Sequence, residues 1–254
     1  VWGEGPGEFI WVTDIAFSPQ GEVYLADEHS HRISVFGADR QFIRTFGGHG
    51  SGPGELDRPS GLEFGPGGNL YVVDTLNHRV QALTANGEFV SKWGALGDAE
   101  GQFNMPWGIA IDISGDVYVT DWRNDRVQKF DAEGNFLMAF GASGGDEGQF
   151  NRPNGIAVDA DGDIYVCDWL NDRVQVFDRT GGFKDVLIGH SGMSKWGQAL
   201  LDANPDIERK LELAVQNIEP KRRFYRPVSV HVDKNGKVYV ADCYRHRVQI
   251  YQKL

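Results

Sequence analysis

The stretch Pro153–Asp178 reads PNGIAVDADGDIYVCDWLNDRVQVFD, and its pattern recurs along the chain. An apolar-Tyr-apolar-x-Asp run is followed, after four further residues, by an arginine and an apolar residue. This spacing occurs at Asp27/Arg32, Asp74/Arg79, Asp121/Arg126, Asp168/Arg173 and Asp242/Arg247. The first four aspartates are 47 residues apart, and a fixed period of this length predicts a repeat architecture.

Each repeat contains four short apolar runs. In the third unit they are GIAID (108–112), DVYVT (116–120), RVQKF (126–130) and FLMAF (136–140). They are rich in β-branched and aromatic residues, lack helical periodicity and are separated by turn residues, which indicates β-strands. Repeating units of four strands, arranged radially, form the blades of a β-propeller. We therefore predict one all-β propeller domain over residues 1–254, with five recognisable units.

The segment that follows each repeat aspartate carries a family resemblance. The copies are LNHRVQ (76–81), RNDRVQ (123–128), LNDRVQ (170–175), RHRVQ (245–249) and the weakest, SHRIS (30–34). They resemble the Asn-His/Asp-Arg-Val-Gln hallmark of NHL repeats, and the likeness covers nearly the whole chain. The resemblance implies an NHL-type propeller. It implies less about activity, because the family includes protein-binding and RNA-binding propellers, sensor domains and a few enzymes.

The two ends of the sequence suggest how the ring closes. Residues 1–9 parallel the connections at 46–56, 93–103 and 140–150, and the chain stops at 249–254, after a third strand. We expect an N-terminal strand to complete the last blade and remove an exposed sheet edge. Because residues 1–2 form a very short strand, we also expect six blades in the intact protein.

One insertion, at about residues 190–224, breaks the period. Asn204-Pro205-Asp206 is typical of a helix start. The apolar residues that follow, at helical spacing, are Ile207, Leu211, Ala214, Val215 and Ile218. We predict a short helical insertion that either caps the channel mouth or packs on its own blade.

Charge and composition narrow the classes of partner. The formal net charge of −11 disfavours nucleic acid, since a phosphate backbone would be repelled. The one basic cluster, Lys221, Arg222, Arg223 and Arg226, is expected to be a solvated loop. No apolar run reaches 18 residues, so no membrane span is predicted. Cys167 and Cys243 are expected to be free thiols, and the cell compartment is not indicated.

Two recurring sets of ionisable residues are interpreted as structural. The Asp/Arg pairs recur in every unit and are expected to bridge a tight hairpin, whereas a catalytic group would be unique. The residues directly before the arginines are His31, His78, Asp125, Asp172 and His246. We expect them to form hydrogen bonds in the turns and not a metal site, and we predict no metal or cofactor.

An aromatic set suggests a binding surface. Its predicted ligand contacts are the rings of Trp107, Trp122, Trp169 and Tyr244, with Arg123 and Asn154 as polar neighbours. All lie in connections expected on the loop-rich face, and tryptophan, tyrosine and arginine are typical of binding hot spots. The alternative is that the rings cover the grooves between blades. We predict a non-catalytic binding or scaffold propeller that recognises a peptide, a protein or a small polar ligand.

A second hypothesis concerns the central channel. The first strands of three units carry a small residue at one position, Ala16, Ala110 or Ala157, whereas Glu63 and His231 occupy it in the other two. These polar groups are predicted to line the channel, where they could serve a metal-dependent lyase or hydrolase. Because we find no second channel histidine, an enzyme is the less favoured function.

Overall fold

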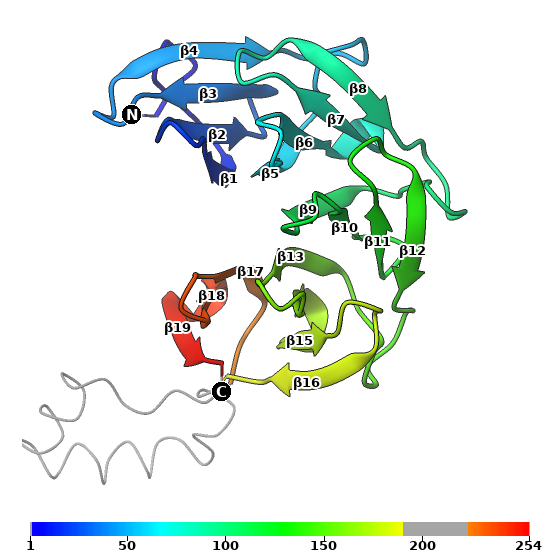
Figure 1. Ribbon diagram of the computed structural model, residues 1–254. Helices are drawn as coiled ribbons and strands as arrows, with labels where there is room; N and C mark the ends of the chain where they lie inside the picture. Colours follow the sequence, from blue (N-terminus) through cyan, green and yellow to red (C-terminus); the bar gives the residue numbers. More distant parts are fainter. Residues whose placement is uncertain (1, 190–222, 254) are drawn as a thin grey trace, which may run out of the picture.

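A computed structural model describes residues 2–189 and 223–253, which form five antiparallel sheets arranged as blades around an axis (Figure 1). Blade 1 contains β1 (Val12–Phe17), β2 (Val23–Asp27), β3 (Arg32–Phe36) and β4 (Phe42–Gly47). Blade 2 contains β5 (Pro59–Phe64), β6 (Leu70–Asp74), β7 (Arg79–Leu83) and β8 (Phe89–Trp93). Blade 3 contains β9 (Pro106–Ile111), β10 (Val117–Asp121), β11 (Arg126–Phe130) and β12 (Phe136–Phe140).

Blade 4 contains β13 (Pro153–Val158), β14 (Ile164–Asp168), β15 (Arg173–Phe177) and β16 (Phe183–Leu187). Blade 5 has three strands, β17 (Pro227–Val232), β18 (Lys237–Asp242) and β19 (Arg247–Gln252). The described residues contain no α-helix, only the 3-10 turns η1 (Thr75–Asn77), η2 (Trp169–Asn171) and η3 (Cys243–Arg245). The predicted propeller is thus confirmed with five blades, of which blades 1 to 4 have four strands and blade 5 has three among the described residues. The helical insertion predicted at about 190–224 lies outside the described residues, apart from positions 223 and 224.

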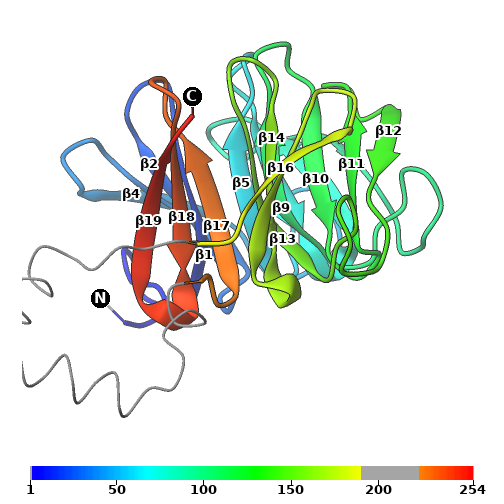
Figure 2. The same cartoon turned by 90° about the horizontal axis from the view of Figure 1, so that it is seen from below.

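The first strand of each blade lies innermost (Figure 1), and the blades pack face to face, with the inner strands upright beside one another in the side view of Figure 2. Contacts run from β1 to β5, then to β9, β13 and β17. Apolar residues fill the space between successive blades; Tyr24, Val72 and Val119, for example, are fully buried. Backbones approach closely at the axis, since a Cβ added to Gly108 would lie 2.4 Å from the Asn154 carbonyl oxygen. The core therefore lies between successive blades.

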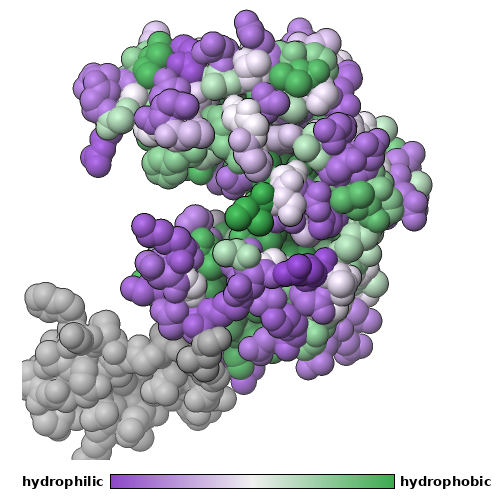
Figure 3. Space-filling view, viewed as in Figure 1, coloured by the Kyte–Doolittle hydropathy of each residue, from purple (hydrophilic) through white to green (hydrophobic). Residues whose placement is uncertain are grey.

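The ring is open between blade 5 and blade 1 (Figures 1 and 3). Apolar side chains are exposed on both open faces: Phe17 of β1 is 67% exposed, and Val248 and Ile250 of β19 are 62% and 60% exposed. The expectation that an N-terminal strand completes blade 5 was wrong, because Trp2 forms a parallel bridge with Phe9 and no strand pairs with the outer edge of β19 among the described residues. The same bridge recurs as His49 with Leu56 and at two later connections. The segment therefore folds as a connection and not as a strand of the last blade.

The recurring aspartate and arginine form a buried ion pair, which we call the clamp together with the Asn and Gln that join it. In blade 2, Arg79 Nε donates to Asp74 Oδ2 at 2.7 Å, and Asn77 and Gln81 donate to the same carboxylate at 2.9 and 3.2 Å. The carboxylate also accepts the backbone N–H of Asp57 at 2.6 Å. The clamp thus joins the end of one strand to the connection before the blade, and the predicted structural role is confirmed in blades 2 to 5.

Blade 1 departs from this pattern. Asp27 and Arg32 form no ion pair, because Asp27 accepts the backbone N–H groups of Ile10 and Trp11 at 3.1 Å each. The Arg32 guanidinium donates instead to backbone carbonyl oxygens, including that of Glu8 at 2.8 Å. Ser30 and Ser34 stand where blade 2 has Asn77 and Gln81. The prediction of five equal pairs was therefore wrong for the first unit, whose clamp lacks the long amide side chains.

Three further predictions concern the cysteines, the histidines of the turns and membrane-spanning segments. Both cysteines are free, Cys167 buried and Cys243 exposed. His31 and His78 accept backbone N–H groups through Nδ1 at 3.1 and 3.0 Å, but the donors, Arg58 and Met105, lie in the connection before the next blade and not in the turn. These histidines therefore form hydrogen bonds as predicted, but between blades and not within the turns. Among the described residues, no helix has the length and apolarity needed to cross a membrane.

Candidate functional site

Three tryptophans from two neighbouring blades lie side by side at one mouth of the channel. Trp107 is the second residue of β9, Trp122 follows β10, and Trp169 begins the 3-10 turn after β14. The ring centroids of Trp107 and Trp122 are 6.5 Å apart, and those of Trp122 and Trp169 are 6.4 Å apart. All three side chains are partly exposed. Residues distant in sequence are thus brought into one row.

Guanidinium groups extend this row toward blade 5. Arg152 lies 5.0 Å from the centroid of Trp122, and Arg226 lies 5.0 Å from that of Trp169. Arg226 is also 5.1 Å from the centroid of Tyr244. We call the set the Trp–Arg row; its members are Trp107, Trp122, Arg152, Trp169, Tyr225, Arg226 and Tyr244. Alternating cations and rings attract one another through the ring quadrupole, which holds the row in place.

The structure places the six predicted ligand-contact residues in different parts of the channel and its mouth. Trp107, Trp122, Trp169 and Tyr244 belong to the row. Arg123 adjoins it, with its guanidinium 5.8 Å from the Trp122 centroid. Asn154 is only 9% exposed and lines the channel, so it is placed for contact with something inside the channel and not on the rim.

Sequence reasoning missed Arg152, Tyr225 and Arg226. Arg152 and Arg226 directly precede the proline that begins an inner strand, and both have a positive φ, 60° and 57°. Carboxylates of the preceding blade stabilise this backbone conformation, because Asp125 and Asp172 accept the backbone N–H groups of the two arginines at 2.8 Å each. The signal was the residue before the proline that begins an inner strand in blades 2 to 5, which is an arginine in blades 2, 4 and 5. Arg226, expected in a solvated loop, instead stacks against rings.

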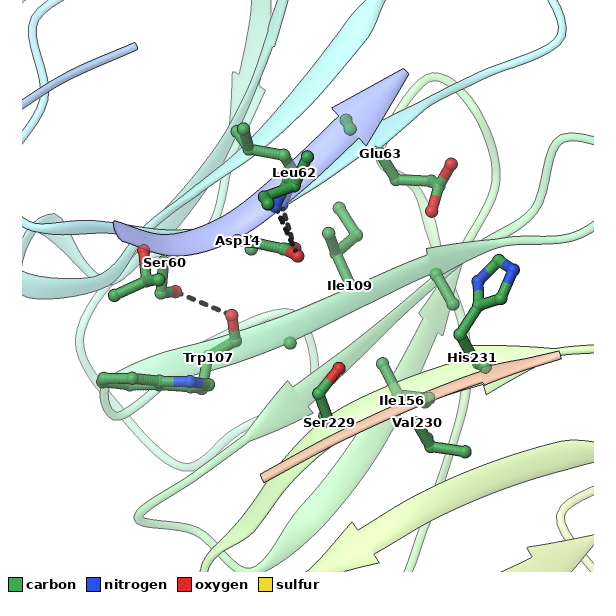
Figure 4. A pocket seen from close by; sticks show the side chains of 18 of the residues that line it. Asp14, Ser60, Leu62, Glu63, Trp107, Ile109, Ile156, Ser229, Val230 and His231 are labelled. Carbon is green, nitrogen blue, oxygen red and sulfur yellow. Dashed lines mark hydrogen bonds between the residues drawn. The ribbon is translucent and has the colours of Figure 1, made fainter. Parts of the chain in front are cut away.

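The channel itself is a cavity of about 770 Å³ lined by the five inner strands. Glu63 of β5 and His231 of β17 point into it (Figure 4). Asp14 of β1 is a further carboxylate in the lining, and its Oδ2 accepts the Leu62 N–H at 2.8 Å. Sequence reasoning missed Asp14. It stands where the next three units have Gly61, Gly108 and Gly155, and that departure from glycine was the available signal.

Burial shifts the pKa of both carboxylates upward. Desolvation raises the pKa of Asp14 to about 6, against the opposing effect of the Leu62 N–H. Desolvation, followed by the nearby charge of Asp14, raises the pKa of Glu63 to about 7. Glu63 is therefore partly protonated at neutral pH and can both give and take a proton.

The channel does not form a metal centre among the described residues. No three of its His, Asp or Glu side chains bring ligand atoms within 4.8 Å of one another. A mechanism that needs a three-ligand metal in the channel is therefore less well supported than proton transfer by the two carboxylates.

Comparison with solved structures supports the propeller fold. The chain is similar to a catalytically inactive virginiamycin B lyase from Staphylococcus aureus, with a TM-score of 0.61 and 13% identity over 95% of this chain and 69% of that one. It is similar to a gluconolactonase from Xanthomonas campestris, with a TM-score of 0.63 and 14% identity over 96% and 73% of the two chains. A chain of a nidogen/laminin complex has a TM-score of 0.59 and 16% identity over 95% and 80%. At such identities the likeness shows the fold alone.

Comparison with curated protein sequences finds no match. The NHL repeat family model matches residues 9–36, 56–83, 103–130, 150–177 and 224–251. These five matches coincide with the five blades and cover more than half of the sequence. The chain belongs to the NHL repeat family.

Proposed function

We propose that this chain is a non-catalytic binding module that recognises an acidic segment of a peptide or protein along the Trp–Arg row. The observation that carries the proposal is the stack of three tryptophans with Arg226 at its end. Partly exposed rings beside guanidinium groups supply both apolar contact and charge, which is typical of binding hot spots.

The charges of the row favour an anionic ligand. Within residues 2–189 and 223–253, no carboxylate forms an ion pair with the guanidinium of Arg123 or Arg226. Arg152 approaches Asp125, but only at 3.7 Å. The chain as a whole is strongly acidic, with a net charge of −11. Positive charge is therefore concentrated where the rings are exposed, and a carboxylate-bearing ligand would be directed to this mouth.

The test uses two fluorescein-labelled peptides of equal length, one of Glu-Gly and one of Lys-Gly repeats, and measures fluorescence anisotropy. We expect the acidic peptide to bind and the basic peptide not to bind. Trp122→Ala and Arg226→Ala should each weaken binding by about 30-fold, the effect of removing a 2 kcal/mol hot spot.

Trp11→Ala is the matched control, because Trp11 is 64% exposed and occupies in blade 1 the position of Arg226. It should leave binding unchanged. Failure of the acidic peptide to bind would reject the proposed ligand class. Equal losses in Trp11→Ala and Trp122→Ala would reject the row as the site.

A second candidate function is a lyase or hydrolase with its site in the channel. The observation that favours it is the pair of carboxylates, Asp14 and Glu63, whose pKa values are both raised inside one cavity. Two solved structures of similar fold are a lyase and a gluconolactonase. Lactone hydrolysis that is lost in Glu63→Gln but retained in Trp122→Ala would establish this function in place of the binding module.

We also propose that a sixth unit of the same kind closes the ring. Val248 and Ile250 on the open face of blade 5 stand where blade 4 has Val174 and Val176, which are 0% and 7% exposed. Val174→Ala should cost about 2 kcal/mol of unfolding free energy through lost burial and a cavity. In a chain extended by one repeat, Val248→Ala should cost as much; a neutral effect there would contradict the sixth unit.

A further inference from the structure

A second group of side chains lies at the junction of blades 1 and 2, away from the Trp–Arg row. It consists of His31, in the turn between β2 and β3, and of His49 and Asp57, in the connection between β4 and β5. One ligand atom from each residue lies within 4.8 Å of the others. His31 Nδ1 is 3.2 Å from Asp57 Oδ1, and His49 Nε2 is 3.8 Å from Asp57 Oδ2.

We propose that His31, His49 and Asp57 bind a divalent cation of the Zn²⁺ type. A tetrahedral zinc ion with bonds of about 2.1 Å holds its ligand atoms roughly 3.4 Å apart, and the two separations above bracket that value. Two imidazoles and one carboxylate form a ligand set suited to zinc. A fourth position remains for water or for an anionic group of a ligand.

The repeats show that this combination is specific to one junction. At the next junction the equivalent residues are His78, Leu96 and Asn104, and at the one after it they are Asp125, Ser143 and Asn151. Ser143 there donates a hydrogen bond to Asp125, so these two positions touch in more than one unit. Only the first junction places three metal-binding side chains at these positions, among the described residues.

The backbone holds the three residues in place. The Asp57 N–H donates to the clamp carboxylate of Asp74 at 2.6 Å, and the Asp57 carbonyl accepts the Leu76 N–H at 3.0 Å. His49 is anchored by its bridge to Leu56. A site whose ligands are positioned before the ion arrives loses little conformational freedom on binding.

The charges around the site are compatible with a cation. The neighbouring guanidinium of Arg58 is paired with Glu28 at 3.2 Å, and His29 is exposed. His31 Nδ1 accepts the Arg58 N–H at 3.1 Å, an exposed hydrogen bond that can pass to water when the metal binds.

The experiment is a zinc titration of the untagged chain after treatment with a chelator, followed by calorimetry. Cobalt absorption serves as a second probe of tetrahedral coordination. We expect one Zn²⁺ per chain and a rise in melting temperature with zinc, because the ion joins blades 1 and 2. Asp57→Asn, which copies the next two units, and His49→Ala should each weaken binding by at least about tenfold.

His78→Ala is the matched control, because His78 has the same turn position but lacks the other two ligands. It should leave zinc binding unchanged. Since His49 is exposed and asparagine is the residue of other units, both test variants should fold. The absence of stoichiometric zinc binding, binding that survives both variants, or an equal loss in His78→Ala would overturn the proposal.

Discussion

At the mouth of the channel, the connections of blades 3 to 5 and those of blades 1 and 2 have the same backbone arrangement but carry different side chains. After the clamp aspartate, blades 3 and 4 have Trp122 and Trp169, both partly exposed. Blade 2 has Thr75, which is 2% exposed and donates its hydroxyl to the Pro106 carbonyl oxygen at 2.9 Å. The clamp therefore keeps the strand ends in register, while the residue that follows the clamp aspartate can differ from blade to blade.

The channel shows the same contrast between blades. Blades 1 and 2 contribute the carboxylates of Asp14 and Glu63, whereas blades 3 and 4 contribute Ala110 and Ala157 at the position of Glu63. Residues that recur in every unit maintain the fold, whereas residues that occur in only one or two units determine which functional groups line the channel and its mouth. Substitutions can test this division directly.

The largest effect is expected from Asp74→Ala, which would break the shared frame. The change leaves Arg79, 5% exposed, without its carboxylate and removes the acceptor of the Asp57 N–H. Breaking a buried pair in this way should cost about 3–5 kcal/mol of unfolding free energy, measured by urea denaturation. Asp27→Ala in blade 1 should cost less, because Asp27 has no ion pair. Equal losses in the two variants would show that the ion pair contributes nothing.

A smaller effect on the unfolding free energy is expected from Glu63→Gln, which changes the channel residue that distinguishes blade 2 from blades 1, 3 and 4. Because the pKa of Glu63 is raised from 4.5 to about 7 on folding, the folded state holds more protons between these values. Stability should therefore fall as pH rises from about 4.5 through 7, then level off. In Glu63→Gln the fall in unfolding free energy across this pH range should be smaller than in the wild type by roughly 1–2 kcal/mol. This is less than the full pKa shift implies, because the Glu63 side chain is partly exposed.

Urea denaturation of the two proteins across this pH range would measure the difference. Ala110→Gln, at the equivalent position in blade 3, should leave the pH profile of the wild type unchanged, since it removes no ionisable group. Parallel profiles for wild type and Glu63→Gln would contradict the raised pKa of Glu63.

The smallest effect on stability is expected from Trp122→Thr, which copies blade 2 into blade 3. The variant loses the contact between Trp122 and Arg152, whose guanidinium lies 5.0 Å from the ring centroid. Such a partly exposed cation–π contact contributes about 0.5–1 kcal/mol. Thermal denaturation should show a shift of a few degrees at most. A loss of several kcal/mol would mean that the tryptophan is part of the core and not a binding surface.

Much of the fold could be predicted from the sequence, because each unit carries its own strand pattern and its own aspartate and arginine. The site was less accessible. Trp122 and Trp169 could be identified by composition, but Arg226 was expected in a solvated loop. Asp14 was overlooked because its one signal was the replacement of a glycine that recurs in the next three units. His49 and Asp57 form no sequence motif with His31, since His31 and Asp57 are 26 positions apart.

By itself, the sequence determined the repeat, the strands, the clamp and the family, because these depend on local pattern repeated at fixed spacing. Only the tertiary structure decided which side chains meet. Packing of one blade on the next brings Arg226 against Trp169, Asp14 beside Glu63, and His31 beside Asp57. The physical reason is that residues at different positions of successive units become neighbours only when the blades stack, and a repeat period does not state which of them then meet.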